Sequence, residues 1–223
     1  MPSWLDEVLD YDDNFVPADL KSDDEFDMDL PIRGGRDEIA RLDWKGLAQR
    51  VAECELCELH KTRTNTVFGV GNQEADLLVI GEAPGAEEDK QGEPFVGRAG
   101  QLLNAMLLAI GLKREQVFIA NILKCRPPNN RDPRPEEAAL CEPYLQRQLS
   151  LVQPKVILCV GRVAAQNLLN SQDPVGRMRG KVFDYNGIPV IVTYHPAYLL
   201  RSPDQKGKAW DDLQAAARRL QSN

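Results

Sequence analysis

Four short apolar runs that alternate with helical patterns are the feature that most constrains the fold of this chain. The runs cover residues 77–80, 117–123, 156–160 and 190–193. Apolar residues at helical spacing predict helices around them, over residues 43–53, 99–110, 135–152, 162–170 and 208–221. Strands that alternate with helices form a parallel sheet with helices on both faces. We therefore expect an α/β fold, a three-layer sandwich with a central four-stranded parallel sheet.

The direction of these strands also predicts where a ligand would bind. In an open parallel sheet, ligands bind beyond the carboxyl ends of the strands. The loops that follow Ile80, Leu123, Val160 and Thr193 should therefore carry the chemistry of the protein.

Acidic residues are concentrated at the start of the chain. Residues 1–32 hold eleven Asp and Glu and a single Lys, a charge of −10, whereas the whole chain carries −7. The remainder is mildly basic, at +3, which is compatible with binding to nucleic acid. We expect residues 1–36 to be a disordered acidic tail, either merely solvated or bound to a partner protein. Residues 37–223 then form one globular domain.

Two patterns that would place the chain in or beyond a membrane are missing from the sequence. No apolar run reaches the roughly 18 residues that a membrane span needs. The first residues lack the basic and then apolar pattern of a secretory signal. We therefore expect a cytoplasmic protein, in which thiols are free or metal-bound rather than paired in disulfides.

Cysteine spacing indicates a metal site. Cys54 and Cys57 form a C-x2-C pair, and Cys125 and Cys141 follow after 67 and a further 15 intervening residues. Four such thiolates bind either zinc or a [4Fe–4S] cluster, and spacing alone does not choose between them. The alternative is a set of unrelated thiols. Cys159 lies inside an apolar run and is interpreted as a small buried hydrophobic residue.

The loop after the first strand is rich in glycine and proline. It reads Gly-Glu-Ala-Pro-Gly over residues 81–85 and lacks the dinucleotide and phosphate-loop patterns. Its backbone N–H groups can come close to a ligand at the sheet edge. Phe95 follows within the sequence Gly-Glu-Pro-Phe-Val-Gly-Arg-Ala-Gly. It is either a platform on which a planar base stacks or a core residue at the start of a helix.

The loop after the second strand is basic. Lys124, Arg126, Arg131 and Arg134 lie within eleven residues that contain one acidic residue. Such a loop suits contacts to a phosphate backbone, but it also fits a merely solvated surface. His195, one of two histidines, follows the fourth strand and is either structural or part of an active site.

Five motifs, in this order, closely resemble the family 4 uracil-DNA glycosylases. They are C-x2-C, Gly-Glu-Ala-Pro-Gly-x-x-Glu-Asp, Gly-Glu-Pro-Phe-Val-Gly-Arg-Ala-Gly, Asn-Ile-Leu-Lys-Cys-Arg-Pro-Pro and His-Pro-Ala-Tyr-Leu-Leu-Arg. The resemblance spans about residues 50–220 and excludes the acidic tail. It implies a [4Fe–4S] cluster on Cys54, Cys57, Cys125 and Cys141. It also implies a DNA-repair reaction that hydrolyses the N-glycosidic bond of deoxyuridine, releases uracil and leaves an abasic site.

The same resemblance implies roles for individual residues. Phe95 should stack on the flipped uracil, and Asn121 should hydrogen-bond its O4/N3 edge. Glu88 should crowd the C5 position against thymine, and Gly81 should border the base. His195 should support O2 as negative charge builds there. Contacts to DNA are expected from Lys124, Arg126, Arg131 and Arg201.

One departure from the wider superfamily concerns the attacking water. The best-known branch reads Gly-Gln-Asp-Pro-Tyr where this chain has Gly81–Gly85, so Ala83 stands in the place of the aspartate that handles water. Glu82 or Asn130 is the candidate replacement. A sister group traps DNA through a histidine in a basic loop. The loop 124–135 has no histidine, which favours an enzyme that turns over.

Two other classes of protein compete with this hypothesis. One is a zinc-containing α/β hydrolase or nucleotide-processing enzyme that uses Glu82 and His195. The other is a DNA-binding accessory module without activity. For the glycosylase we expect a nucleoid-associated monomer that acts on uracil in single- or double-stranded DNA. Its acidic tail would bind a replication or repair protein.

Overall fold

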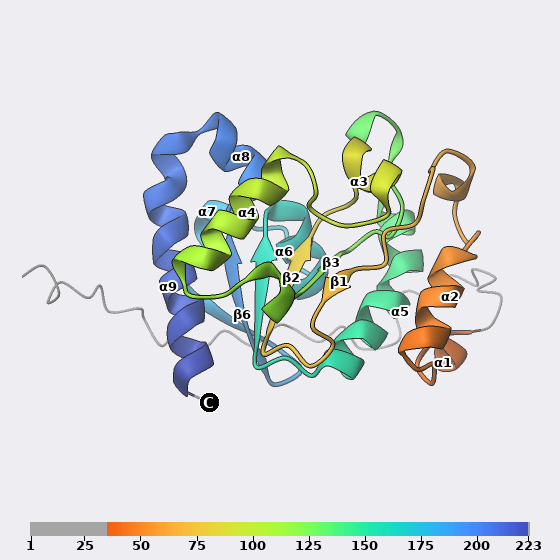
Figure 1. Ribbon diagram of the computed structural model, residues 1–223, viewed down its shortest axis with the longest axis horizontal. Helices are drawn as coiled ribbons and strands as arrows, with labels where there is room; N and C mark the ends of the chain where they lie inside the picture. Colours follow the sequence, from red (N-terminus) through yellow and green to blue (C-terminus); the bar gives the residue numbers. More distant parts are fainter. Residues whose placement is uncertain (1–34, 223) are drawn as a thin grey trace, which may run out of the picture.

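The computed structural model describes residues 35–222, which form helices packed around one six-stranded sheet (Figure 1). The strand order is β1-β3-β2-β4-β6-β5. The strands are β1 (Val70–Gly71), β2 (Leu77–Gly81), β3 (Phe118–Asn121), β4 (Val156–Val160), β5 (Val182–Tyr185) and β6 (Ile188–Thr193).

The four central strands β3, β2, β4 and β6 are parallel, as predicted. Their register pairs Gly81 with Asn121 and Val160 with Thr193, so the carboxyl ends of all four strands meet at one edge. β1 and β5 are added antiparallel at the two borders, so the sheet is mixed rather than purely parallel. β5 reaches β6 through Asn186 and Gly187, which both have positive φ, as a tight hairpin requires.

The long helices lie where the spacing of apolar residues predicts them. They are α2 (Trp44–Ala52), α4 (Arg98–Ala109), α5 (Pro135–Val152), α6 (Arg162–Leu169) and α9 (Lys206–Ser222). The Asp43 carboxylate caps α2 by accepting from the Gly46 N–H at 2.7 Å. Four shorter helices complete the fold: α1 (Arg36–Ile39), α3 (Ala86–Gln91), α7 (Val175–Met178) and α8 (Pro196–Arg201).

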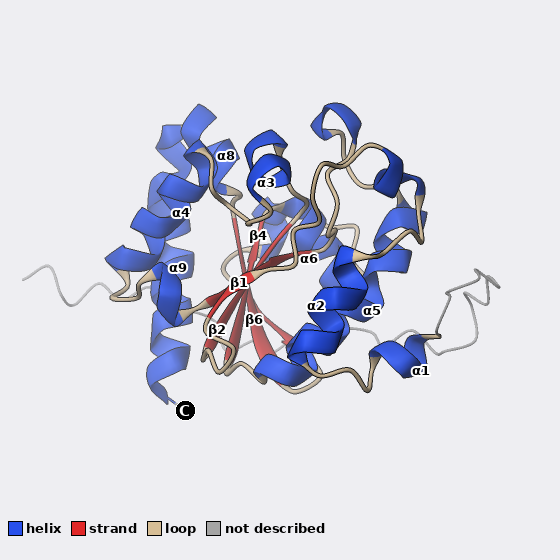
Figure 2. Cartoon of the chain, turned by 45° about the vertical axis from the view of Figure 1, so that its right-hand side comes forward, coloured by secondary structure: helices blue, strands red, loops and turns tan. Residues whose placement is uncertain are grey.

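The alternation of side chains along each strand builds two cores, one on each face of the sheet (Figure 2). Leu78 and Ile80 point to the face covered by α5 and α6, whereas Leu77 and Val79 point to the face covered by α4 and α9. β2, β3 and β4 are buried along their whole length and β6 along its last four residues, as in other parallel sheets. A smaller cluster joins α1 and α2 to the outer side of α5, and the molecule is therefore a three-layer sandwich with an added N-terminal helical pair.

The structure bears on the expectations for Cys159, for the acidic tail and for a membrane span. Cys159 is completely buried within β4, as predicted. The acidic tail predicted over residues 1–36 lies outside the described residues apart from its last two, of which Arg36 already begins α1. Within residues 35–222, no helix combines the length and the apolar character that crossing a bilayer requires.

Candidate active site

The carboxyl edge of the sheet assembles residues from four separate loops. β2 and β3 stay joined past their ends, because the Ile122 and Leu123 N–H groups donate to the carbonyls of Gly81 and Glu82 at 3.0 and 3.1 Å. In Figure 1 the short helices α3 and α8 lie together at this edge of the sheet. The edge predicted from strand direction therefore holds the candidate active site.

Gly81 brings an aromatic ring and an amide into one small space. A Cβ atom on this residue would lie 2.4 Å from the Asn121 Oδ1 and 2.7 Å from the Phe95 ring. Those distances are shorter than any real Cβ contact, so only glycine allows both side chains to approach the strand end. The structure thus brings together three of the residues that were assigned to the uracil pocket.

Asn121 presents a buried amide that lacks a protein partner for its oxygen. The side chain is 2% exposed, and its Oδ1 accepts no hydrogen bond from the described part of the chain. An unpaired buried acceptor costs about 1–3 kcal/mol, so it marks a place where a ligand supplies the missing donor. A primary amide offers a donor and an acceptor side by side, which matches a cyclic imide or amide edge.

Phe95 adopts a backbone conformation that is rare for an aromatic residue. Its φ is +52°, a region that costs roughly 1–3 kcal/mol for a bulky side chain and persists only where the surroundings enforce it. Its ring is buried and stacks on His195, with centroids 5.6 Å apart and planes inclined by 29°. The ring is therefore held rigidly next to both His195 and Asn121.

Two clamps enforce the conformation of the Phe95 loop. From α3, the Glu88 Oε1 accepts from the N–H groups of Val96 and Gly97 at 2.9 and 3.1 Å. From the other side, the Arg114 guanidinium donates to the carbonyls of Pro94 and Phe95 at 2.5 and 3.4 Å, and it also pairs with Glu93. Glu88 thus has a loop-holding role that the sequence did not indicate.

His195 is fixed as a neutral ring at the start of α8. Its Nδ1 accepts from the Ala197 N–H at 3.1 Å, so the ring proton lies on Nε2. The pKa of His195 is lowered to about 4, chiefly by burial and also by the charge of Arg201, while Glu88 opposes the shift. Gly161, at the end of β4, has φ +101°, and a Cβ there would lie 2.9 Å from the His195 Cβ.

Glu82 is the acidic side chain at this edge that titrates near neutral pH. The pKa of Glu82 is raised to about 7, chiefly by burial and also by the negative charge of Asp132, while Arg162 opposes the shift. Asp132 and Arg162 are themselves paired at 2.5 Å, so they form an ion pair beside the Glu82 carboxyl. A carboxylate with such a pKa is suited to act as a general base at physiological pH.

Asn130, the other candidate for handling water, lies in a different environment. It is exposed in the short 3₁₀ turn Pro128–Asn130, and its Oδ1 accepts from the Arg126 Nε at 2.7 Å. The described interaction between this loop and Glu82 is the electrostatic effect of the Asp132 charge on the Glu82 carboxyl. Of the two candidates, Glu82 directly follows β2, whereas Asn130 lies in an exposed turn.

The predicted DNA contacts separate into buried and exposed cations. The expectation for Lys124 is wrong, because its side chain is 1% exposed and its Nζ donates to the Asn121 carbonyl at 2.8 Å and the Gln148 Oε1 at 2.7 Å. Burial lowers the pKa of Lys124 to about 8, and the charges of Cys141 and Cys125 partly offset that effect. A group enclosed in this way cannot reach a phosphate.

The three arginines differ in how free they are. Arg131 is held by both oxygens of the buried Glu137, at 2.9 and 2.6 Å. Arg126 is half-buried, and Arg201 is exposed at the end of α8, close enough to His195 to lower its pKa. Arg126 and Arg201 therefore remain the clearest candidates for phosphate contact.

Four of the five cysteines gather on one side of the site, where the loop after β3 meets the N-terminal segment. Cys125 and Cys141 are buried with Leu59 and Leu123, and Cys57 packs against them. Burial raises the pKa of Cys125 to about 11 and of Cys141 to about 12, and each thiol also responds to the charge of other thiols in the group. All the cysteines are free thiols.

These thiols form an all-sulfur donor set with an apolar lining. The Arg63 guanidinium donates to the Cys125 sulfur at 3.2 Å and to the Cys54 carbonyl at 2.7 Å. Within residues 35–222, no group of three or more His, Cys, Asp or Glu side chains converges on the position of a single ion. Soft sulfur donors of this kind are the ligands of zinc and of iron–sulfur clusters.

Several residues of this site were not singled out from the sequence. Gly161 and Arg162 follow a buried strand directly, so the position of that glycine at a strand end was a usable signal. Arg114 and Arg63 carried no signal, because each is distant in sequence from the loop that it holds.

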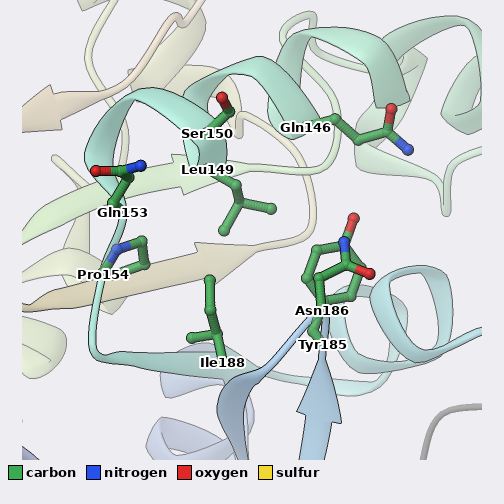
Figure 3. A pocket seen from close by; sticks show the side chains of 8 residues that line it. All are labelled: Gln146, Leu149, Ser150, Gln153, Pro154, Tyr185, Asn186 and Ile188. Carbon is green, nitrogen blue, oxygen red and sulfur yellow. The ribbon is translucent and has the colours of Figure 1, made fainter.

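A hollow of about 570 Å³ lies at the opposite edge of the sheet, by the amino ends of β4 and β6 (Figure 3). Figure 3 shows side chains from the end of α5 on one side and from the β5–β6 hairpin on the other. The lining contains amides, a hydroxyl, a phenol and apolar groups, but no charged residue: Gln146, Leu149, Ser150, Gln153, Pro154, Tyr185, Asn186 and Ile188. The hollow is thus far from the groups whose chemistry is described above.

Comparison with known proteins agrees with this geometry. Residues 68–214 match the profile of the Uracil DNA glycosylase superfamily. The chain is 49% identical over 175 residues to the type-4 uracil-DNA glycosylase of Archaeoglobus fulgidus, which covers 75% of this chain and 88% of the relative. It is 46% identical to that of Thermotoga maritima (70% and 82% covered) and 42% identical to that of Saccharolobus solfataricus (79% and 86% covered). The chain therefore belongs to the uracil-DNA glycosylase superfamily and, within it, to the type-4 family.

Proposed function

We propose that this protein is a DNA-repair enzyme that hydrolyses the N-glycosidic bond of deoxyuridine in DNA, releasing uracil and leaving an abasic site. The observation that carries the proposal is the buried Asn121 amide, whose oxygen has no partner among the described residues and which lies beside Phe95 at Gly81. This arrangement is complementary to a uracil edge, in which N3–H donates and O4 accepts.

Recognition begins with the removal of the base from the stack. A base inside a duplex cannot reach a buried amide, so the nucleotide must rotate out, at a cost of a few kcal/mol that is least for a mismatched base. The uracil ring would stack on Phe95 while the Asn121 oxygen accepts from N3–H and its amide nitrogen donates to O4. Cytosine presents the opposite donor and acceptor pattern along this edge, so its binding would leave polar groups unpaired.

Bond cleavage leaves negative charge on uracil and positive charge on the sugar. The neutral His195 would donate from Nε2 to the pyrimidine O2 as the bond to C1′ breaks, and one such donor contributes about 3 kcal/mol. Water then adds to C1′ and gives its proton to the Glu82 carboxylate, whose pKa of about 7 suits that task. The released uracil anion takes a proton from solvent.

We assign the exclusion of thymine to Glu88, whose carboxylate would form one wall of the base pocket. A Cβ on Gly85 would lie 2.6 Å from the Glu88 Oε2, and the Oε1 is bonded to the loop after Phe95. The carboxylate is therefore fixed between the two loops that border the pocket. A side chain that cannot move aside excludes a C5 methyl group by steric conflict.

The cofactor of the proposal is a [4Fe–4S] cluster held by Cys54, Cys57, Cys125 and Cys141. Support comes from the all-sulfur donor set, its apolar lining and the Arg63 N–H···S contact. When bound, the cluster supplies a cross-link between the N-terminal segment and the loop after β3. Its role in the enzyme is then structural, because it fixes the residues that flank the base pocket.

Contacts to DNA are assigned to the cations around the carboxyl edge, chiefly the exposed Arg201 and the half-buried Arg126, with Arg131 contributing through its exposed part. Such contacts position the strand without reading its sequence. We further propose that the enzyme acts as a nucleoid-associated monomer on single- or double-stranded DNA. The acidic segment 1–36 would bind a replication or repair protein.

A glycosylase assay on an oligonucleotide with one uracil, followed by alkaline cleavage, tests the proposed function. The enzyme should release free uracil and leave a strand break at that position after alkali. A zinc-dependent nucleotide hydrolase would leave the oligonucleotide intact, and an accessory DNA-binding module would bind it without releasing uracil. Either result would overturn the proposal.

A further inference from the structure

Lys124 is a lysine enclosed in the protein interior, directly behind the base pocket. Its side chain is 1% exposed, and its Nζ lies 2.8 Å from the Asn121 carbonyl oxygen and 2.7 Å from the Gln148 Oε1. Gln148, on α5, is itself fully buried, and its Nε2 donates to the Phe68 carbonyl at 2.8 Å. The four residues form one continuous buried polar network.

The backbone of Lys124 is fixed as firmly as its side chain. Its carbonyl accepts from the Val67 N–H at 2.7 Å, and it directly precedes Cys125 of the thiol group. The ammonium group is therefore held from two directions, by the loop to which it belongs and by α5. The ammonium group therefore keeps its position when surface side chains or loops move.

Hydrophobic packing alone does not account for a lysine at this position. Burying an ammonium group costs several kcal/mol before any partner is counted, and a well-packed apolar side chain of similar volume is often equally stable or more so. Within residues 35–222, the recorded hydrogen bonds of the Nζ go to one backbone carbonyl and one side-chain amide oxygen, both neutral, and the Cys141 and Cys125 thiols act on it electrostatically. Lys124 is distinguished by the group to which it donates. That carbonyl belongs to Asn121, whose side-chain amide oxygen has no partner among the described residues.

Asn121 needs an anchor of this kind. It is the last residue of β3, paired there with Gly81, so its carbonyl lies where the strand gives way to a loop. A movement of that peptide group rotates the Cα–Cβ direction and displaces the side-chain amide. A charged donor on the carbonyl resists this movement more strongly than a neutral one, because hydrogen bonds from charged groups are about twice as strong.

We propose that Lys124 is a positioning residue for base recognition, whose ammonium group, held by Gln148, fixes the Asn121 peptide and thereby the amide that reads the pyrimidine. This inference rests on the proposed function, because it takes the edge of a uracil base to be what the Asn121 amide binds. It adds a buried support, reaching from α5 to the pocket, that makes no contact with substrate.

A double-mutant cycle between Lys124 and Asn121 tests this role. Single-turnover uracil excision is measured for the wild type, Lys124→Met, Asn121→Ala and the double variant. We expect Lys124→Met to slow the wild type by about tenfold, the middle of the range for residues of one hydrogen-bond network. In the Asn121→Ala background the same change should alter the rate by less than about twofold, as for an interaction that is already lost.

Arg147→Met is the control for loss of a cationic donor to a backbone carbonyl, at a half-buried position. Arg147 also lies on α5, and its Nε donates to the Leu42 carbonyl at 2.6 Å, away from the pocket. It should lower the thermal midpoint while leaving the excision rate within about twofold of the wild type. If Lys124→Met does not fold, Gln148→Met takes its place in the cycle, because it removes the oxygen that holds the ammonium group.

A second measurement does not depend on excision. The Asn121 side-chain amide resonance of the labelled protein should shift when free uracil is added, and in Lys124→Met it should shift less or broaden. Equal slowing by Lys124→Met in both backgrounds, together with an unchanged Asn121 response to uracil, would show that Lys124 only stabilises the fold. Failure of the wild type to release uracil would instead remove the proposed function and leave the resonance test of Asn121 standing.

Discussion

One edge of the parallel sheet contains the open hollow, and the opposite edge contains the residues of the candidate active site. The amino edge contains an open hollow of about 570 Å³, lined without a charged side chain. The carboxyl edge holds the Asn121 oxygen, which has no partner within residues 35–222, the strained Phe95, a carboxyl with a pKa of about 7 and a histidine with a pKa of about 4. The candidate site is therefore identified by groups in unusual states and not by empty space.

Residues with positive φ occur at both edges of the sheet, and they differ in what maintains that conformation. Gln153 and Asn186 at the amino edge have positive φ because one ends α5 and the other forms a two-residue hairpin turn. Phe95 neither ends a helix nor forms such a turn, and its φ is maintained by Glu88 and Arg114. Strain that the surroundings enforce on a bulky residue is a sign of function.

The largest expected effect concerns the thiol group beside the carboxyl edge. Cys125→Ala should abolish iron binding and strongly lower the thermal midpoint, because metal binding energy contributes directly to folding. Cys159→Ala, inside β4, should keep the iron and cost only about 1 kcal/mol, as for other small core truncations. Iron content and thermal unfolding are the measurements. A wild type without iron would contradict the assignment of the cofactor.

Glu82→Gln should slow excision by about a hundredfold or more at pH 8, the loss typical of a missing general base. In the wild type the rate should fall as pH falls through about 7, because protonation removes the base, and the Gln variant should lack this dependence. Single-turnover rates between pH 5 and 9 test both points. An unchanged pH profile in the variant would exclude Glu82 as the titrating base.

The same shift predicts the effect of pH on stability. The folded pKa of Glu82 is raised above the ordinary value of 4.5, so its contribution to stability is present below about 4.5 and is lost as pH rises through about 7. Relative to the wild type, Glu82→Gln should therefore become more stable between pH 5 and pH 8. His195 has a lowered pKa, so it should stay neutral over this whole interval.

A pair of glycine substitutions compares the two edges directly. Gly81→Ala should reduce excision by about a hundredfold, because a Cβ there displaces Asn121 and Phe95 and ångström-scale misplacement costs that much. Gly187→Ala, in the β5–β6 hairpin, has open space but φ +83°. It should cost about 1 kcal/mol of stability and leave excision unchanged. If both variants kept full activity, the pocket would not lie at Gly81.

The smallest effect is expected from the clamp on the Phe95 loop. Arg114→Met should lower kcat/KM for uracil excision by about tenfold, through loss of a charged hydrogen bond to the Pro94 carbonyl. Arg177→Met removes an exposed arginine of α7 as the control and should change nothing. Equal rates for both variants would show that Glu88 alone suffices to hold the loop.

Much of the fold could be predicted because buried parallel strands leave a strong signal. The four central strands and the long helices agree with the predicted segments within a few residues, and α5 agrees at both ends. β1 is only two residues long, so periodicity could not reveal it. β5 was missed although the Asn186-Gly187 pair that follows it is a usual hairpin signal.

Less of the site could be predicted, because the charge of a loop residue does not reveal whether its side chain points into the protein or towards solvent. Lys124 and Arg126 are two residues apart in the same basic segment, yet one is enclosed and the other reaches the surface. Residues two apart on an extended segment would point to the same side, so the difference arises from the bends after β3, which the sequence does not reveal. The clamps from Glu88 and Arg114 likewise depend on contacts between segments that are distant in sequence.

Release of free uracil is the measurement that tests the central claim most directly. Wild type, Asn121→Ala at the carboxyl edge and Asn186→Ala at the amino edge are compared on one uracil-containing oligonucleotide. The account predicts full release by the wild type and by Asn186→Ala, and a loss of about a hundredfold or more for Asn121→Ala with unchanged affinity for undamaged DNA. Equal uracil release by all three proteins would contradict it.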